Sequence, residues 1–156
     1  MTGVTMTEPI AVPEKLSDLI RLAIADGRKL YQERSGEYCP DAYLFHEVGY
    51  DFQQNKQVCH VCLAGTVMAG TLHTDNRYSL IPSDFDTSWT KALRALDYVR
   101  QGMYVNALTI LYGPGEYQFA LTQSLPAQYL FLGWDAFLDH LDNLGFAVGF
   151  LQDHGY

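Results

Sequence analysis

The sequence predicts a mainly α protein, a compact single-domain helical bundle around a buried central helix. The chain has 156 residues, which is the length of one domain, and 48% of them are apolar, enough to bury a core. Residues 58–72 carry apolar side chains on every side of a helical wheel, which is typical of an enclosed helix. Apolar residues also recur at helical spacing before and after that stretch.

The first helix is predicted over roughly 14–34, after a flexible tail of residues 1–12. Residues 13–156 then form the single helical domain. Pro13 suits the first turn of a helix because its missing N–H is not needed there. The apolar positions that follow at helical spacing are Leu16, Leu19, Ile20, Ala23, Gly27, Leu30 and Tyr31.

Pro40 indicates the start of a short second helix through Val48, and Gly49 would stop it. A polar loop over residues 50–57 leads to the central helix 58–72. Strand is disfavoured for that stretch because its two Gly and two Ala residues pack poorly in a sheet. A stripe of small residues along the helix lets a neighbouring backbone approach closely, and its members are Cys62, Gly65 and Ala69.

A third helix is predicted over about 87–101, with Asp86, Thr87 or Ser88 as its N-terminal cap. The pattern then fits either a helix that continues to Tyr112 or a short β-hairpin near 105–122 that turns at Gly113–Gly115. Residues 134–152 form the last predicted helix. Its apolar positions are Phe137, Leu141, Leu144, Val148 and Leu151.

The charge is negative and unevenly distributed. The formal net charge is −8, and residues 101–156 contain five acidic residues but no Lys or Arg. A protein that binds nucleic acid needs a basic patch to displace counterions, so no nucleic acid is expected as a partner. An anionic membrane surface is disfavoured for the same reason, and we expect no membrane partner.

The N-terminal residues and the cysteines favour a cytoplasmic location. The start of the chain lacks the basic and apolar regions of a secretory signal. Three cysteines are an odd number, and their spacing matches no secreted disulfide framework, so reduced thiols are expected.

The cysteines raise the question of a metal site. The motif "CHVC" at residues 59–62 is a single Cys-x-x-Cys pair, whereas a structural zinc site usually offers two such pairs or adds a pair of histidines. One alternative set of zinc ligands exists on paper: Cys39, Cys59, Cys62 and His73. A thiol-dependent activity of the three cysteines is a related alternative. Because a free Cys packs as a small apolar residue, we favour core cysteines without metal or cofactor.

Known catalytic motifs are absent. The chain has no GxSxG, GxxxxGK[ST], GxGxxG or HExxH pattern. His46 and His73 each stand near an acid, in "FHE" and "HTD", but acid–base partners must meet in space. The sequence therefore names no catalytic residue, and a non-enzymatic role is favoured.

Three aspartates of the last helix mark the candidate binding site. Asp135, Asp139 and Asp142 are spaced i, i+4, i+7 and lie along one helix face. Since no Lys or Arg follows Arg100, this face is predicted to dock onto the basic surface of a protein partner. A DNA-mimicking inhibitor and a self-associating homo-oligomer are the two alternatives for such a surface.

The segment "VCHVCLAGTVMA" at residues 58–69 resembles a helix of small uncharacterised bacterial and phage proteins, a domain-of-unknown-function family. In that family the helix also follows an N-terminal helix and a polar loop. The resemblance implies a mostly helical fold and no activity, and it carries over no functional residue. Together with the charge, it leads us to expect an acidic protein-binding module, such as a phage-type or accessory modulator of a cellular protein.

Overall fold

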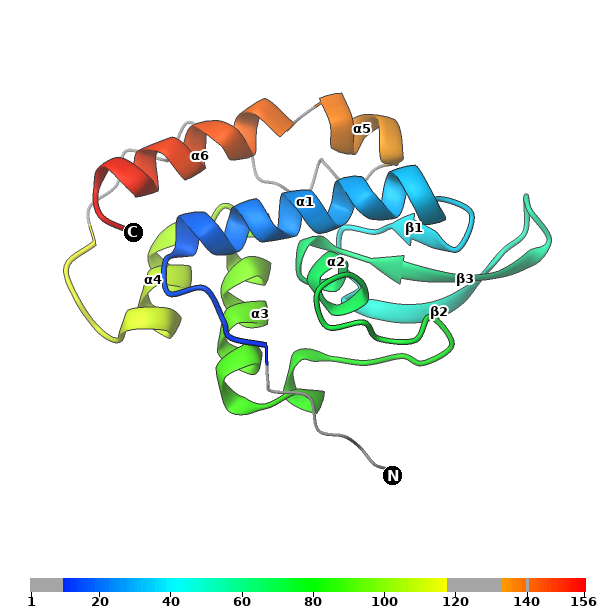
Figure 1. Ribbon diagram of the computed structural model, residues 1–156, viewed down its shortest axis with the longest axis horizontal. Helices are drawn as coiled ribbons and strands as arrows, with labels where there is room; N and C mark the ends of the chain where they lie inside the picture. The colour runs from blue at the N-terminus through cyan, green and yellow to red at the C-terminus, as the bar shows by residue number, and fades with distance from the viewer. Residues whose placement is uncertain (1–9, 118–132, 140) are drawn as a thin grey trace.

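The computed structural model describes residues 10–117, 133–139 and 141–156. Within these ranges, six α-helices and a small three-stranded mixed sheet form one domain (Figure 1). The predicted mainly helical class is therefore confirmed, whereas the sheet was not predicted. None of the helices in the described ranges is long and apolar enough to cross a bilayer.

The sheet lies at one end of the molecule and the helices make up the rest. Its strand order is β1-β3-β2, with β3 parallel to β1 and antiparallel to β2. In chain order the elements are α1 (Leu16–Arg34), β1 (Tyr38–Pro40), β2 (His46–Asp51), β3 (Lys56–Val61), α2 (Leu63–Ala69), the 3-10 helix η1 (Pro82–Asp84), α3 (Thr87–Arg100), α4 (Tyr104–Tyr112), α5 (Trp134–Asp139) and α6 (Leu141–Asp153).

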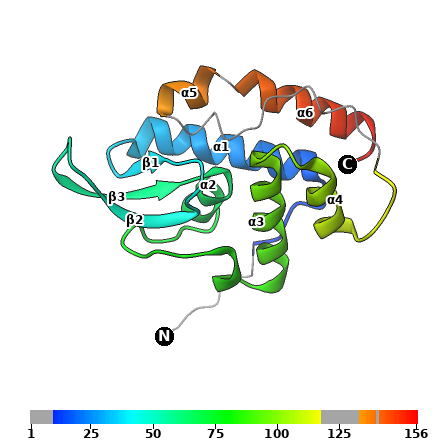
Figure 2. The same cartoon turned by 180° about the vertical axis from the view of Figure 1, so that it is seen from behind.

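Helix α2 is the centre of the fold. All of its residues, from Leu63 to Ala69, are buried. It contacts α1, α3, β2 and β3, which surround it in Figures 1 and 2. The buried hydroxyl of Thr66 lies 2.7 Å from the carbonyl oxygen of Leu63 and 3.2 Å from that of Ala23 on α1, so its proton has an acceptor.

The predicted central helix 58–72 is wrong in its first part. Residues 58–61 belong to strand β3, and only 63–69 are helical. The Gly and Ala residues that argued against a strand all lie at or after Ala64, whereas Val58 and Val61 are β-branched and suit a sheet. The pattern correctly indicated that this stretch is largely buried, but its first residues form a buried strand and only the later ones form a buried helix.

The predicted helix from Pro40 to Val48 is also wrong, because this part of the chain contributes two strands. The Asp41 carboxylate accepts the N–H of Tyr43 at 2.8 Å and that of Leu44 at 3.1 Å, which fixes a turn between β1 and β2. Gly49 does not stop a helix but pairs with Val58 in the sheet.

The predicted polar loop 50–57 is shorter than expected: residues 52–55 form the turn of a β-hairpin, and the residues on either side belong to β2 and β3. Asp51 pairs with Lys56 across its end, and Asn55 takes the left-handed conformation with φ 54°. The hairpin of β2 and β3 extends away from the helices, as Figure 2 shows.

The remaining predicted helices are largely confirmed. α1 and α3 match their predicted ranges to within two residues, and the Asp86 carboxylate caps α3 by accepting the Trp89 N–H at 3.0 Å. The ambiguous stretch is helix α4 up to Tyr112, so the hairpin near 105–122 is wrong there, and residues 118–122 lie outside the described ranges. The last helix is divided into α5 and α6, with residue 140 undescribed.

The predicted flexible tail is described only from residue 10. The carbonyl oxygen of Ile10 accepts the indole N–H of Trp89 at 2.8 Å, so this residue is attached to α3. Residues 1–9 lie outside the part of the chain that the structure describes.

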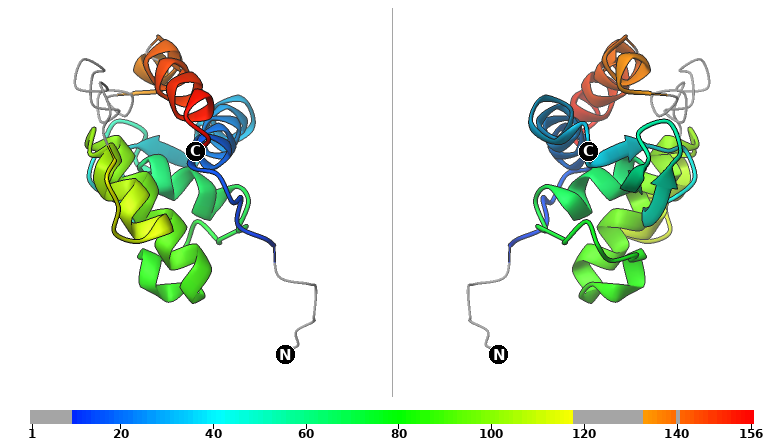
Figure 3. Two further views of the ribbon diagram at one scale, coloured as in Figure 1. Left: turned by 90° about the vertical axis from the view of Figure 1, so that its left-hand side faces the viewer. Right: turned by 90° about the vertical axis from the view of Figure 1, so that its right-hand side faces the viewer.

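Helices α5 and α6 lie on the side of α1 that faces away from α2 (Figures 1 and 3). The buried ring of Phe137 on α5 rests on Gly27 of α1, where even a Cβ atom would overlap it. The indole of Trp134 donates to the carbonyl oxygen of Tyr38 on β1 at 3.2 Å. α1 therefore separates the α2 layer from the α5–α6 layer.

The tightest packing occurs at Gly65 of α2, which predicts the effect of a single methyl group. A Cβ there would overlap the carbonyl oxygen of Phe45 and lie 2.9 Å from the Cβ of Val61. The backbone that approaches the small stripe at Gly65 is therefore that of Phe45, which directly precedes strand β2, and it does not belong to a helix. Gly65→Ala should lower the free energy of unfolding by about 1–3 kcal/mol or more, measured by chemical denaturation.

Gly145→Ala is the matched control, because no atom of the described residues lies within 4 Å of a Cβ built on this exposed glycine of α6. Alanine has the higher helix propensity, so this variant should be as stable as the parent chain or more stable. If Gly65→Ala were equally harmless, the close packing of α2 would be contradicted.

Candidate functional site

The three predicted aspartates lie on the two helices that cover α1. Asp135 and Asp139 belong to α5 and Asp142 to α6, and all three are exposed. Helices α5 and α6 turn their buried side chains inward, among them Phe137 and Leu144. Within the described residues, none of the three carboxylates forms an ion pair.

Sequence reasoning missed two apolar side chains on the same helices. Leu138 is 38% exposed and Phe146 is 61% exposed. Phe146 follows Asp142 by four positions, so both lie on one side of α6, and Leu138 follows Asp135 by three on α5. The signal was present in the sequence, since Leu138 and Phe146 do not fit the apolar spacing of the buried side. Because α5 and α6 are separate helices, the spacing of a single helix does not by itself place all three aspartates on one face. We call the exposed set on the two helices the outer face: Asp135, Leu138, Asp139, Asp142 and Phe146.

The three cysteines lie in different environments. Cys59 and Cys62 have no exposed surface and belong to two separate apolar clusters, whereas Cys39 is partly exposed. Cys39 pairs with His60, and Tyr38 with Cys59, so the side chains of Cys39 and Cys59 point to opposite faces of the sheet. The structure therefore does not bring the three thiols together.

The alternative zinc ligands are not gathered either. In the described part of the chain, no group of three or more His, Cys, Asp or Glu residues is placed to hold a metal ion. Burial raises the pKa of Cys59 and of Cys62 to about 12, so both are neutral thiols at pH 7. A metal ligand or nucleophile needs the thiolate. His73 lies in the turn that follows α2, whereas Cys39 lies on strand β1.

His46 is a buried structural residue. Its Nδ1 lies 2.8 Å from the carbonyl oxygen of Tyr78, and because a carbonyl can only accept, Nδ1 carries the proton. The other ring nitrogen, Nε2, is buried and has no hydrogen-bond partner among the described residues. Burial lowers the pKa of His46, so the ring is held neutral. The His46 carbonyl also accepts the Leu80 N–H at 2.8 Å, which fixes the segment after α2 to the sheet.

The acids beside the two predicted histidines do not pair with them. Glu47 alternates with His46 along β2 and is exposed. Asp75 pairs with Arg77 at 2.7 Å instead of with His73. Neither "FHE" nor "HTD" therefore forms an acid–base pair.

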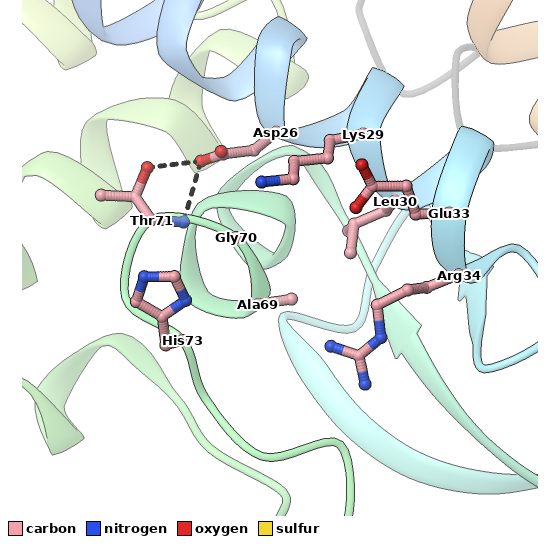
Figure 4. A pocket seen from close by; sticks show the side chains of 9 residues that line it. All are labelled: Asp26, Lys29, Leu30, Glu33, Arg34, Ala69, Gly70, Thr71 and His73. Atoms are coloured by element: carbon pink, nitrogen blue, oxygen red, sulfur yellow. Dashed lines mark hydrogen bonds between the residues drawn. The ribbon is translucent and has the colours of Figure 1, made fainter.

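A cleft of about 360 Å³ lies between the second half of α1 and the turn after α2 (Figure 4). We call it the α1–α2 cleft. On one side, Asp26 accepts the hydroxyl of Thr71 at 2.7 Å and its N–H at 3.2 Å. Burial raises the pKa of Asp26, while these hydrogen bonds act in the opposite direction. The lining residues are Asp26, Lys29, Leu30, Glu33, Arg34, Ala69, Gly70, Thr71 and His73.

Comparison with known proteins gives no relative. The chain matches no protein-family model, no curated protein and no solved structure. The resemblance at residues 58–69 stays an expectation, and any role for the outer face or the cleft must be argued from their own chemistry.

The burial of the cysteines predicts their order of reaction. Cys39 should react first with an aromatic disulfide reagent, although burial and the nearby Asp51 and Asp41 raise its pKa. Cys59 and Cys62 should react only when the chain unfolds, because they are buried and neutral. Mass spectrometry of the labelled peptides gives the order, and Cys39→Ser should remove the early phase. Equal rates at all three positions, or one zinc per chain in elemental analysis, would contradict this picture.

The buried His46 predicts a loss of stability in mild acid. In the unfolded chain the pKa of histidine is about 6.5, and burial lowers the folded value. As the pH falls below about 6.5, the unfolded state binds a proton that the folded state does not. The free energy of unfolding should then decrease by up to about 1.4 kcal/mol per pH unit.

His46→Asn serves as the control for this pH dependence. Asparagine keeps a donor for the Tyr78 carbonyl but cannot titrate. Urea denaturation of both proteins between about pH 7 and pH 5 should give a shallower dependence for the variant. If the free energy of unfolding depended on pH equally in both proteins, burial of His46 would not contribute to the acid sensitivity, and the prediction would be wrong.

Proposed function

We propose that the chain is a non-enzymatic protein-binding module whose outer face docks onto a partner with a basic rim around an apolar surface. The observation that carries this proposal is the exposure of Phe146 and Leu138 among carboxylates that have no ion-pair partner within the described residues. A merely solvated face has no need of these two apolar side chains, although one alone would be ordinary.

The two kinds of side chain have different roles in such an interface. An aromatic anchor that becomes buried supplies affinity, and Phe146, 61% exposed, is the aromatic side chain of the outer face. Exposed charges contribute mainly to the rate of encounter and to specificity, and salt screens them. Asp135, Asp139 and Asp142 would thus steer a basic surface toward Phe146.

Two alternatives receive less support. A DNA mimic presents negative charge to a protein that binds phosphates, whereas the outer face mixes its carboxylates with Leu138 and Phe146. Two copies joined through their outer faces would bring like charges together, which is unfavourable. We therefore favour a different protein as the partner, in keeping with a phage-type or accessory modulator.

The state of the buried thiols and of His46 supports the non-enzymatic part of the proposal. Among the described residues, Cys59 and Cys62 are neutral buried thiols. The buried His46 donates from Nδ1 to the Tyr78 carbonyl at 2.8 Å, and the neutral thiol of Cys59 lies 3.4 Å from the same nitrogen. These observations leave docking as the role that the outer face supports best.

Photo-crosslinking in cells tests the proposal at residue resolution. A benzophenone amino acid at position 146 should form a discrete adduct with one partner protein, and the crosslinked peptide should lie on a basic surface. The same group at Gln53, on the exposed hairpin turn, should not form this adduct. The triple change Asp135→Asn, Asp139→Asn and Asp142→Asn should reduce the adduct, because encounter slows without the charges.

A second triple variant controls for net charge. Glu14, Glu47 and Glu116 are exposed and lie outside the outer face, so replacing them by Gln removes the same charge elsewhere. This control should leave the adduct at position 146 unchanged. If both triple variants behaved alike, or if position 146 gave no discrete adduct, docking through the outer face would be refuted.

A further inference from the structure

The α1–α2 cleft has an apolar floor between charged walls. Leu30 of α1 and Ala69 of α2 are 3% and 5% exposed and close the bottom of the cleft. Lys29 and Glu33 stand at its rim on α1, and His73 stands opposite, as Figure 4 shows. A hollow of about 360 Å³ with a small apolar floor and a few polar groups has the size and character of a small-molecule site.

Several of the lining groups already have partners. Asp26 is bonded to Thr71, and its carboxylate rests against Gly70, where a Cβ would lie 2.5 Å from its Cγ. Arg34 donates from Nε and Nη2 to the two carboxylate oxygens of Glu37, both at 2.8 Å. These pairs fix the walls of the cleft, and they leave Asp26 and Arg34 little remaining hydrogen-bonding capacity for a ligand.

Lys29 and Glu33 are the charged groups that remain. Both are exposed, and within the described part of the chain neither forms an ion pair. They are four positions apart on α1, so they lie on the same side of that helix. One is a cation and the other an anion, and the apolar floor lies beside both.

The balance of charge narrows the class of ligand. A purely anionic molecule would gain from Lys29 but would also face Glu33 and Asp26. A purely cationic molecule would gain from Glu33 but would be repelled by Lys29 and Arg34. A molecule that carries both charges and an apolar body matches the ammonium, the carboxylate and the floor at once.

We propose that the α1–α2 cleft binds a zwitterionic α-amino acid with an aliphatic side chain. The carboxylate of the ligand pairs with Lys29, its ammonium group pairs with Glu33, and its side chain lies on Leu30 and Ala69. The turn after α2 closes the far side, where His73 holds the left-handed conformation with φ 53° and its N–H donates to the Gly70 carbonyl at 3.2 Å. This site lies apart from the outer face and does not depend on the docking proposal.

Titration of the full-length ¹⁵N-labelled chain with L-leucine tests the site. The amide signals of Ala69, Gly70, Thr71 and His73 should shift in a saturable way. Lys29→Gln and Glu33→Gln should each weaken binding at least about tenfold, the effect of losing a hydrogen bond to a charged group. Arg28→Gln removes a neighbouring exposed charge that does not line the cleft, and it should leave the affinity unchanged.

Leucine derivatives assign each charge to its partner. Leucinamide lacks the carboxylate, so it should bind more weakly than leucine and be indifferent to Lys29→Gln while remaining sensitive to Glu33→Gln. N-acetylleucine lacks the ammonium group and should show the reverse pattern. Glycine lacks the aliphatic body and should bind more weakly than leucine.

Four results would overturn the proposal. The first is the absence of saturable shifts at the cleft up to the solubility of leucine. The second is an affinity that neither Lys29→Gln nor Glu33→Gln changes. The third is an N-acetylleucine or leucinamide that binds as tightly as leucine, and the fourth is equal binding of glycine.

Discussion

Helix α2 is enclosed on every side, and this enclosure determines where the surrounding elements lie. Its seven residues have almost no exposed surface, so each neighbour must present apolar atoms or a satisfied polar group to it. Gly65 permits the closest of these contacts, with the backbone at Phe45. Thr66 makes the polar one, with the Ala23 carbonyl of α1. The sheet and α1 are thereby placed against opposite parts of one short helix.

Both proposed sites depend on that arrangement through α1. One side of α1 meets the end of α2, where the Asp26–Thr71 hydrogen bonds shape the α1–α2 cleft. Away from α2, Gly27 receives the ring of Phe137, which seats α5. Once α5 and α6 bury their apolar side on α1, their remaining side chains, Phe146 among them, must face solvent. A change that loosened α2 would therefore disturb the cleft and the outer face together.

The sequence predicted the long helices well because their signals are local. A regular apolar spacing defines α1, and the Asp86 cap defines the start of α3. The sheet was missed because its strands are short and depend on pairing between distant residues, such as Tyr38 with Cys59. Val58, Cys59 and Val61 give both faces of β3 buried apolar side chains, and a buried strand of that kind cannot be told from a buried helix by periodicity.

For the candidate sites too, features with a local sequence signal were predicted and features that depend on distant residues were not. The aspartates of the outer face were visible as a spaced pattern, whereas the exposure of Phe146 became known only when α6 was seen to bury its other side. The α1–α2 cleft was not predicted, because α1 and the turn after α2 are far apart in the chain: Asp26 and Thr71 are separated by 45 residues. No local signal in "GTLHTD" indicates that it would lie against α1.

Native-state hydrogen exchange tests the central claim that α2 is the enclosed centre of this fold. With denaturant added in small amounts, the amides of Val67, Met68 and Ala69 should exchange only through global unfolding, so their exchange free energies should equal the global free energy of unfolding. The amides at the ends of α5 and α6 should exchange through smaller openings. The account would be contradicted if α2 exchanged through a local opening while α1 and α3 remained protected.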